Sequence, residues 1–370
     1  MIIASLSLTQ TQTHSWVPAM AANIALALVL VLPLLQLVNG EHKIDDYRGR
    51  CDLYDGRWVY DNSYPLYNLS HCSFVLKQFA CQRNGRPDKL YLKYRWQPSA
   101  CNLPRFNGVT FLRRYRNKRI LFVGDSLCLN QWQSLACMLH SATPHSEYKF
   151  EKTGSLRTFT FTEYNVSVMH LWNAFLVDIV PKRYGRVLTL NKLDTKTWQG
   201  IDVLIFNTWH HWLYPARKQP WDFVDDGKHK YKDMNRFAAY EIGLKTWARS
   251  VDKSVDPRKT KVFFQGISPD HFIESYSGLH NGKNCNGEAK PALADEHPWH
   301  QHPAELALEK VLRNMSKPVH LLNVTRMSKL RKDAHPSVYG VGGHRGMDCT
   351  HWCLAGVPDT WNQLLYAELI

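Results

Sequence analysis

Several signatures of common protein classes are missing from this 370-residue sequence. It has no long run of Lys or Arg, no zinc-finger spacing and no RNA-recognition signature, so we expect no nucleic-acid partner. It has no glycine-rich loop of the nucleotide-binding type, so no local signal supports a bound nucleotide cofactor. Internal repeats and low-complexity stretches are also missing, which argues against repeat and fibrous architectures.

What the chain does have is material for a large core and an excess of positive charge. Its hydrophobic content of 44%, with 13 tryptophans, argues against disorder, and its length allows one large α/β domain or two smaller ones. Lys and Arg number 46 against 32 Asp and Glu, giving a net charge of +14. Such a surface attracts an acidic polymer or an anionic membrane, as well as nucleic acid.

An apolar run over residues 24–37 marks the amino-terminal region, 1–40, as a targeting segment. With its flanks it spans about 18 residues, between the lengths of a signal-peptide core and a membrane span. Residues 1–19 contain no Lys or Arg, whereas Lys43, Arg48 and Arg50 follow the run, which is poor polarity for an anchor with a cytoplasmic amino end. A cleaved signal and an uncleaved anchor both remain open, and either one sends the chain into the secretory pathway.

Cysteines and glycosylation acceptors agree with that route. N-x-Ser/Thr acceptors occur at Asn68, Asn165, Asn314 and Asn323. The nine cysteines include no pair of C-x-x-C elements, so we expect disulfides and no metal site. Because nine is odd, at least one thiol is left over, and Cys128 is our candidate.

The pattern of apolar residues changes along the chain. Residues 41–115 are rich in Cys, Trp and Tyr with weak periodicity, which predicts a loop-rich, disulfide-held subdomain. From 116 to 370 the pattern predicts a domain in which strands alternate with helices, an α/β fold with a mostly parallel sheet and helices on both faces. We expect strands at 120–123, 174–180, 203–206, 262–264 and 319–322, a hairpin around Asn165, and helices at 129–139, 234–251, 304–315 and 358–369.

One of these strands ends in Gly124-Asp125-Ser126. Ligands of open α/β sheets bind beyond the carboxyl ends of the strands, so Ser126 is a candidate nucleophile there. Gly124 would permit a tight turn, and helix N–H groups after it could stabilise a developing anion. A structural alternative is that Asp125 or Ser126 only caps the helix.

Asp348 and His351 supply the other parts of a nucleophilic triad. A serine hydroxyl needs a neighbouring base, and His351 would be that base, with Asp348 fixing its tautomer. The alternative is an ordinary loop pair, but Cys349 and Cys353 bracket the segment and would hold it rigidly through bridges.

A third element follows the strand expected at 203–206. Asn207 could donate to an oxyanion, and Trp209 and Trp212 could stack on a sugar ring. His210 is a further candidate substrate contact. In the alternative interpretation the tryptophans fill the core and the histidines are hydrogen-bonded neighbours.

Taken together these segments resemble the plant trichome birefringence-like family of cell-wall polysaccharide O-acetyltransferases. The resemblance covers residues 50–370 in order. It rests on Cys51-Asp52-Leu53-Tyr54-Asp55-Gly56-Arg57-Trp58, Arg95-Trp96-Gln97-Pro98, Phe122-Val123-Gly124-Asp125-Ser126-Leu127, Asn130-Gln131-Trp132, Lys218-Gln219-Pro220-Trp221-Asp222, His335-Pro336-Ser337, Asp348-Cys349-Thr350-His351-Trp352-Cys353 and Pro358-Asp359-Thr360-Trp361-Asn362. It implies a GDSL/SGNH-like fold with a family-specific amino-terminal subdomain.

The resemblance also assigns roles and bonds. By position, Ser126 matches the family nucleophile, His351 the base and Asp348 its acidic partner, while Asn207 takes the looser place of an oxyanion-hole asparagine. The implied disulfides are Cys51–Cys101, Cys72–Cys137, Cys81–Cys353 and Cys285–Cys349, with Cys128 free. Cys128-Leu129 and Ala334 depart from the family pattern without touching the triad.

The sequence therefore predicts an O-acetyltransferase that moves acetyl through Ser126 onto a cell-wall polysaccharide in the Golgi, or in the wall after secretion. Pectin is preferred over xylan because the Trp209-His210-His211-Trp212 stretch resembles the powdery-mildew-resistance branch of the family, which is linked to pectin, and because a basic protein attracts a polyanionic polymer. An acetyl donor is required; acetyl-CoA is one candidate, although no bound cofactor is expected. Two alternatives are an acetylesterase with the same triad and a non-catalytic protein that binds wall polymers.

Overall fold

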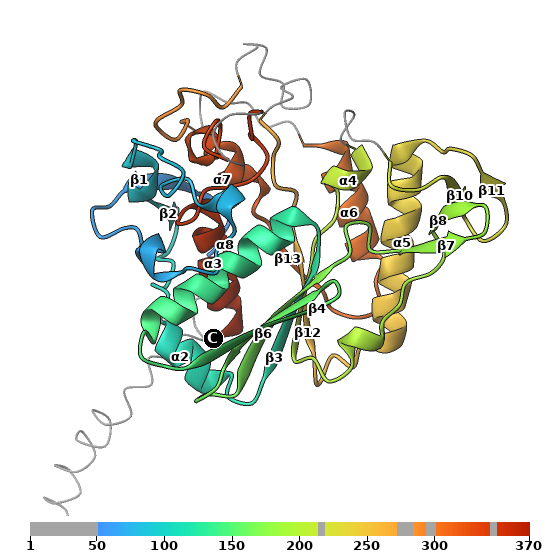
Figure 1. The fold of residues 1–370 in the computed structure, drawn as a ribbon, viewed down its shortest axis with the longest axis horizontal. Helices are drawn as coiled ribbons and strands as arrows, with labels where there is room; N and C mark the ends of the chain where they lie inside the picture. Colours follow the sequence, from blue (N-terminus) through green and yellow to red (C-terminus); the bar gives the residue numbers. More distant parts are fainter. Residues whose placement is uncertain (1–50, 214–218, 272–283, 294–300, 341–345) are drawn as a thin grey trace, which may run out of the picture. The chain divides into compact units, whose positions relative to one another are not determined.

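A computed structural model describes residues 51–213, 219–271, 284–293, 301–340 and 346–370 of the chain (Figure 1). The apolar run at 24–37 lies outside these residues. Within the described ranges, no helix is both long and apolar enough to cross a bilayer.

A sheet of seven strands forms the centre of the described chain. In spatial order its strands are β13 (His320–Leu322), β12 (Lys261–Gln265), β9 (Val203–Phe206), β3 (Arg119–Gly124), β6 (Val166–Trp172), β5 (Leu156–Phe161) and β4 (Tyr148–Thr153). The first five are parallel, and β5 and β4 extend the sheet by antiparallel pairing. The predicted mostly parallel α/β sheet is confirmed.

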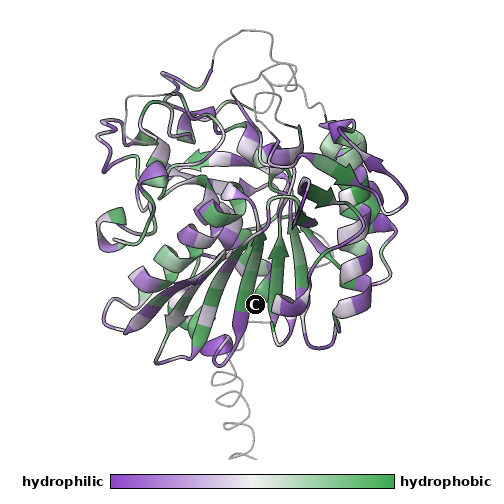
Figure 2. Ribbon diagram, turned by 45° about the vertical axis from the view of Figure 1, so that its right-hand side comes forward, coloured by the Kyte–Doolittle hydropathy of each residue, from purple (hydrophilic) through white to green (hydrophobic). Residues whose placement is uncertain are grey.

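Both faces of the central strands β3, β9 and β12 are buried, as expected where helices cover both sides, whereas the edge strand β4 is exposed. Along β3, Ile120 and Phe122 pack into one hydrophobic cluster, whereas Leu121 and Val123 pack into a second one. The alternation follows from the two-residue period of a strand. Figure 2 shows the apolar residues concentrated along the central strands and on the helix faces beside them.

The helices divide between the two faces (Figure 1). One side carries α2 (Gly108–Arg114), α3 (Ser126–Ala142) and α8 (Val357–Leu369), and the other carries α5 (Arg236–Ser254) and α6 (Pro303–Arg313). The predicted helices correspond to α3, α5, α6 and α8. Short helices α4 (His210–Leu213) and α7 (Thr325–Lys329) follow β9 and β13. Every residue of α3 from 127 to 139 is buried, because α2, α8 and the sheet all pack against it.

The expected hairpin around Asn165 is present, but the strand expected at 174–180 is partly wrong. Strands β5 and β6 pair antiparallel across Asn165. Residues 174–177 form a turn instead, in which Leu176 has a φ of 50°. The run is apolar because it packs into the core: the ring of Phe175 lies 5.1 Å from Trp212 and 5.2 Å from Trp221, centroid to centroid.

Two smaller sheets flank the centre. Strands β1 (Gly56–Tyr60) and β2 (Tyr94–Pro98) form an antiparallel pair in residues 51–102, which we call the amino-terminal part. A second sheet of four strands contains β7 (Asp178–Lys182), β8 (Gly185–Thr189), β10 (Phe223–Asp225) and β11 (Lys230–Tyr231), in the order β11-β10-β8-β7. The sequence did not predict this second sheet, because its strands are short and mostly lack alternation.

Of the four disulfides among the described residues, two join the amino-terminal part to α3 and to the loop before α8, one lies within that part and one lies outside it. The bonds are Cys51–Cys101, Cys72–Cys137, Cys81–Cys353 and Cys285–Cys349, as the family resemblance implied. Cys128 is free and buried, and burial, followed by the charge of Asp125, raises the pKa of its thiol well above the usual value. Residues of this part, such as Phe79 and Trp96, lie in the same hydrophobic cluster as α3 and α8.

Four buried histidines link folding to pH. Burial is the main cause that lowers the pKa of His170 and His335 to about 3, that of His302 to about 4 and that of His271 well below its usual value. Each imidazole therefore binds fewer protons in the folded chain than in the unfolded chain. Stability from this source is complete above the unfolded pKa of about 6.5 and is lost as pH falls toward the folded pKa.

We expect the free energy of unfolding to decrease between pH 7 and pH 5. A fully buried histidine such as His170 accounts for about 2 kcal/mol of that decrease. Burial raises the pKa of Asp359 to about 6 and of Glu305 to about 7, which acts in the opposite direction, but two carboxyls oppose four imidazoles. The measurement is urea unfolding at both pH values.

The matched variants are His170→Leu and His145→Leu, since His145 is exposed. The first should reduce the difference between the two pH values, and the second should leave it unchanged. An unfolding free energy that does not decrease toward pH 5 in the wild-type protein would contradict this account.

Candidate active site

Ser126 stands where β3 turns into α3. Asp125 is the N-cap of α3: its Oδ1 accepts a hydrogen bond from the backbone N–H of Leu127 at 2.9 Å. Ser126 is the first helical residue, and its hydroxyl is not needed for the cap. The capping alternative therefore applies to Asp125 and leaves Ser126 available.

Gly124 is required for close packing, not for an unusual backbone angle. A Cβ atom at this position would lie 2.6 Å from the backbone oxygen of Asn207 and 2.8 Å from Cβ of Cys128. The glycine thus lets the chain after β9 approach the turn that carries Ser126. The expected turn is present, but the physical reason for the glycine is contact with its neighbours.

His351 and Asp348 meet Ser126 in one line of hydrogen bonds. Nε2 of His351 lies 2.7 Å from Oγ of Ser126, and Nδ1 of His351 lies 2.8 Å from Oδ2 of Asp348. The sequence separation of Ser126 and His351 is 225 residues, so only the fold brings them together. The geometry is that of nucleophile, base and orienting carboxylate.

The environment of Asp348 keeps it ionised. Burial acts to raise its pKa, but attraction to protonated His351 and hydrogen bonds outweigh this, so the pKa lies well below its usual range. Its Oδ1 accepts hydrogen bonds from the backbone N–H groups of Thr350 and His351, at 3.1 and 3.0 Å. One carboxylate therefore organises both its own loop and the imidazole.

Segment 348–353 is held from three sides. Cys285–Cys349 and Cys81–Cys353 tie it to two other parts of the chain. The ring of Phe79 lies 5.6 Å from that of His351, and the backbone oxygen of Phe79 accepts a hydrogen bond from Leu354 at 2.9 Å. The amino-terminal part thus contacts the site directly.

Two polar residues near the triad received no role from the sequence. The side chain of Asn130 accepts from Trp352 N–H at 2.9 Å and donates to Trp352 O at 3.2 Å. Nδ1 of His335 lies 2.6 Å from the backbone oxygen of His351. Both belong to motifs that carry the family resemblance, which was the available signal, but a motif does not tell which backbone group a side chain contacts.

The element after β9 differs from the expectation of a sugar-stacking platform. Trp212 is 1% exposed, and its indole N–H donates to Thr208, so it is a core residue. Trp209 is 7% exposed, and its ring lies 3.8 Å from that of His210, which is also buried. Asn207 is 1% exposed, and its Oδ1 has no hydrogen-bond partner in the described residues. Core packing is therefore the correct interpretation for Trp212, and it also describes Trp209.

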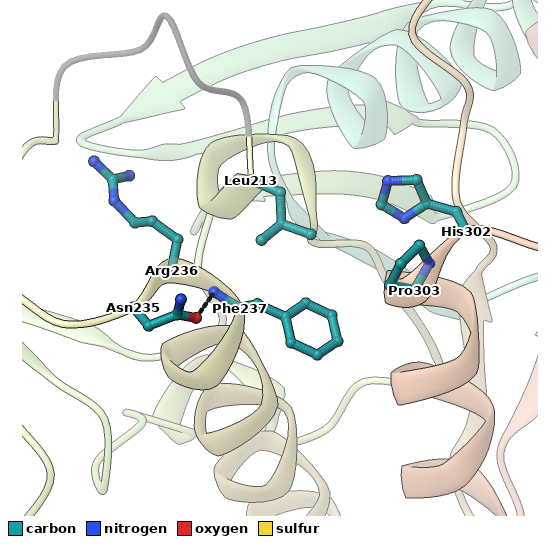
Figure 3. A pocket seen from close by; sticks show the side chains of 6 residues that line it. All are labelled: Leu213, Asn235, Arg236, Phe237, His302 and Pro303. Atoms are coloured by element: carbon teal, nitrogen blue, oxygen red, sulfur yellow. Dashed lines mark hydrogen bonds between the residues drawn. The ribbon is translucent and has the colours of Figure 1, made fainter. Parts of the chain in front are cut away.

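A cavity of about 470 Å³ lies at the same edge of the sheet. Strands β3 and β9 are parallel neighbours, and α4 follows β9 as α3 follows β3, so both helices begin beyond one carboxyl edge. Figure 3 shows Leu213 of α4 and Phe237 of α5 beside the opening, between Arg236 and His302. The lining residues are Leu213, Asn235, Arg236, Phe237, His302 and Pro303.

The helix ends at this cavity are capped internally. Oδ1 of Asn235 accepts from the first-turn N–H groups of Phe237 and Ala238, and Nδ1 of His302 accepts from Ala304. Arg236 therefore supplies the permanent positive charge of the lining. In the described ranges, no group of three or more His, Cys, Asp or Glu residues is arranged to hold a metal ion.

Comparison with known proteins identifies the family. Residues 103–368 match the GDSL/SGNH-like Acyl-Esterase family found in Pmr5 and Cas1p, and residues 49–102 match the PMR5 N terminal Domain. The chain is 50% identical to Protein trichome birefringence-like 43 of Arabidopsis thaliana, over 94% of this chain and 96% of the relative. It is 51% identical to Protein trichome birefringence-like 41, over 93% and 96%, and 39% identical to Protein trichome birefringence, over 86% and 56%, both from the same plant.

We expect Asp348→Asn to lower kcat for hydrolysis of p-nitrophenyl acetate by about 10³- to 10⁴-fold. Asn retains an acceptor for the backbone N–H groups of Thr350 and His351 but places an N–H donor against Nδ1 of His351. The imidazole then favours the tautomer with its proton on Nε2, which cannot accept the proton of Ser126. A variant with the wild-type kcat would show that the carboxylate does not orient the base.

Proposed function

The chain belongs to the GDSL/SGNH-like acyl-esterase family that contains the trichome birefringence-like proteins, and on that premise we propose that it is a polysaccharide O-acetyltransferase. The observation that carries the proposal is the chain of two hydrogen bonds that joins Ser126, His351 and Asp348. Nε2 of His351 lies 2.7 Å from Oγ of Ser126, and Nδ1 of His351 lies 2.8 Å from Oδ2 of Asp348. These hydrogen bonds support an activated serine, and membership of the family supports an acyl group as the group that is transferred.

In the first step, Oγ of Ser126 attacks the carbonyl carbon of a donor acetyl group. Nε2 of His351 takes the hydroxyl proton and then gives it to the departing donor group. The product is an acetyl ester on Ser126. Asp348 stays ionised and stabilises the imidazolium formed along the way.

In the second step, a sugar hydroxyl attacks the acetyl ester. His351 accepts the hydroxyl proton, and Oγ of Ser126 leaves and takes that proton back. The acetyl group ends on the sugar, and the serine is regenerated. In both steps His351 first accepts a proton as a base and then donates it as an acid.

Each step passes through a tetrahedral intermediate whose former carbonyl oxygen carries a negative charge. We assign its stabilisation to the amide of Asn207 and to backbone N–H groups at the start of α3, with Gly124 permitting their approach. The position of Asn207 supports this assignment, because its backbone oxygen lies against Gly124, two residues before Ser126, and its side chain is buried there.

An acetylesterase is the second candidate, and the description of the matched family favours it. The triad and the first step are the same, but water replaces the sugar hydroxyl in the second step. The two activities differ in how well water is kept from the acetyl-serine. A wall-polymer binding protein without catalysis remains the third candidate.

We further propose an acidic acceptor, pectin before xylan, and action in the Golgi lumen or at its membrane, with secretion to the wall as the alternative. The net charge of +14 and Arg236 at the cavity support the acceptor. The four disulfides and four exposed N-x-Ser/Thr asparagines support the compartment. The acetyl donor is a separate substrate, acetyl-CoA being one candidate.

Replacing the nucleophile tests the enzyme class. We expect Ser126→Ala to lower acetyl transfer to galacturonan oligomers by about 10³-fold or more, because the acetyl intermediate forms on Oγ, the atom that His351 activates. The assay supplies an acetyl donor and follows acetylated product by mass spectrometry, with Ser155→Ala in the exposed β4–β5 turn as control. Undiminished transfer by Ser126→Ala would overturn the proposal.

The same assay separates the candidates. Release of acetate from acetylated pectin without a donor, at a rate above that of transfer, identifies the esterase. A wild-type protein that binds galacturonan but neither transfers nor releases acetyl identifies the binding protein.

The acceptor preference is tested at Arg236. We expect Arg236→Gln to raise KM for galacturonan oligomers about 10-fold and to leave KM for unsubstituted xylan oligomers unchanged, because a guanidinium pairs with carboxylates. Arg313→Gln is the matched control: it removes one positive charge from the far end of α6, where Arg313 pairs with Glu309 on the surface. An equal effect of both variants would attribute the preference to overall charge alone.

A further inference from the structure

Two buried histidines outside the triad contact each other. His271 follows β12 and His335 follows the 3₁₀ turn Lys332–Ala334; they are 2% and 1% exposed. Nδ1 of His271 lies 2.6 Å from Nε2 of His335. Neither ring touches Ser126, so the proposed chemistry leaves both unused.

The outer nitrogen of each ring faces a backbone carbonyl. Nδ1 of His335 lies 2.6 Å from the oxygen of His351, and Nε2 of His271 lies 3.1 Å from the oxygen of Lys329. A carbonyl oxygen only accepts, so a ring nitrogen that bonds to it must carry the proton.

Proton counting fixes the tautomers. Three contacts need three N–H groups, but two neutral imidazoles carry only two. Burial lowers the pKa of both rings, so both are neutral at the pH of the secretory pathway. We assign the protons to the two shorter contacts, each of 2.6 Å: His271 donates through Nδ1 to His335, and His335 donates through Nδ1 to the carbonyl of His351. Nε2 of His271 then carries no proton, and its 3.1 Å contact with the oxygen of Lys329 is not a hydrogen bond.

The position of the His335 ring is fixed by its neighbours. It stacks on Trp352 with centroids 4.0 Å apart and an angle of 22° between the planes. Its own backbone oxygen accepts a hydrogen bond from Arg86 at 2.9 Å. The backbone N–H of His271 donates to the oxygen of Cys349, so the second ring is also attached to segment 348–353.

We propose that His335, oriented by His271, is a positioning residue for the general base His351. The directed pair of hydrogen bonds holds the main chain of His351 from outside its own loop, and so keeps Nε2 within 2.7 Å of Ser126. The role rests on the proposed function, because it acts through His351. This role predicts that the rate of catalysis depends on the N–H donor at Nδ1 of His335, and depends less on the rest of the ring.

The matched test is His335→Asn against His335→Gln. The amide nitrogen of Asn reaches the place of Nδ1 and keeps the donor to His351, whereas the amide of Gln reaches the place of Nε2 and loses it. Both variants remove the stacked imidazole from Trp352. We expect His335→Gln to lower kcat for p-nitrophenyl acetate about 10- to 100-fold with KM unchanged, and His335→Asn to stay within about 3-fold of wild type.

A fluorophosphonate probe that reacts with activated serines gives an independent readout on the full-length protein. Labelling of Ser126 should be slow in His335→Gln and near the wild-type rate in His335→Asn. Wild-type protein that the probe does not label would overturn the proposed function. Wild-type protein that is labelled, together with equal rates in the two variants, would overturn the positioning role alone.

The second ring supplies a further test, of which the comparison of the two His271 variants does not depend on folding of the His335 variants. His271→Asn keeps a donor at the Nδ1 position, whereas His271→Leu removes it and frees His335 to change tautomer. We expect slower labelling of Ser126 in His271→Leu than in His271→Asn. Adding His271→Leu to His335→Asn should not lower the labelling rate further, because the amide of the introduced Asn needs no orienting donor. Additive losses would overturn the coupled pair.

Discussion

The hydrogen bond between Ser126 and His351 constrains the rest of the structure. It is 2.7 Å long and joins positions 225 residues apart, so small displacements of either segment break it. Ser126 is placed by a helix that is buried along 13 consecutive positions, from 127 to 139. His351 stands on a short segment without helix or strand, and its position must come from contacts with other parts of the chain.

Those contacts explain the unusual role of the amino-terminal part. Residues 51–102 have little regular structure, and they bury their aromatic side chains in the same cluster as α3 and α8. Through Cys81, Phe79 and Arg86 they also reach segment 348–353 and its neighbour His335. This part therefore helps to fix the position of the loop that carries the base.

The sequence could predict what depends on local pattern and motif. Strands such as β3 and β9, the helices and the hairpin at Asn165 follow from periodicity, and the placement of Ser126, Asp348 and His351 near one another follows from the resemblance. The apolar run at 174–177 predicts a strand, but the structure has a turn there, because an apolar run can be buried without being a strand. Trp212 could be placed in the core or on a sugar, since one residue type serves both.

Contacts between a side chain and a distant backbone group were beyond prediction. The clamp of Asn130 on Trp352 and the bond from His335 to His351 join positions 222 and 16 residues apart, and no periodicity records such a pair. Gly124 illustrates the same limit: its identity indicated a turn, while the structure assigns it to the close approach of Asn207.

Placing neutral histidines around the site has an energetic consequence. His271 and His335 position the base only while they are uncharged, and their burial makes the unfolded chain the better proton acceptor as pH falls. An acidic compartment therefore weakens the fold at the place where the geometry is most demanding. Cys285–Cys349 and Cys81–Cys353 offset this, because a disulfide restricts the unfolded chain at every pH. Both bonds end within two residues of His351. This arrangement is expected if the pH range in which the protein is active is limited by the local stability of this segment, and not by that of the sheet.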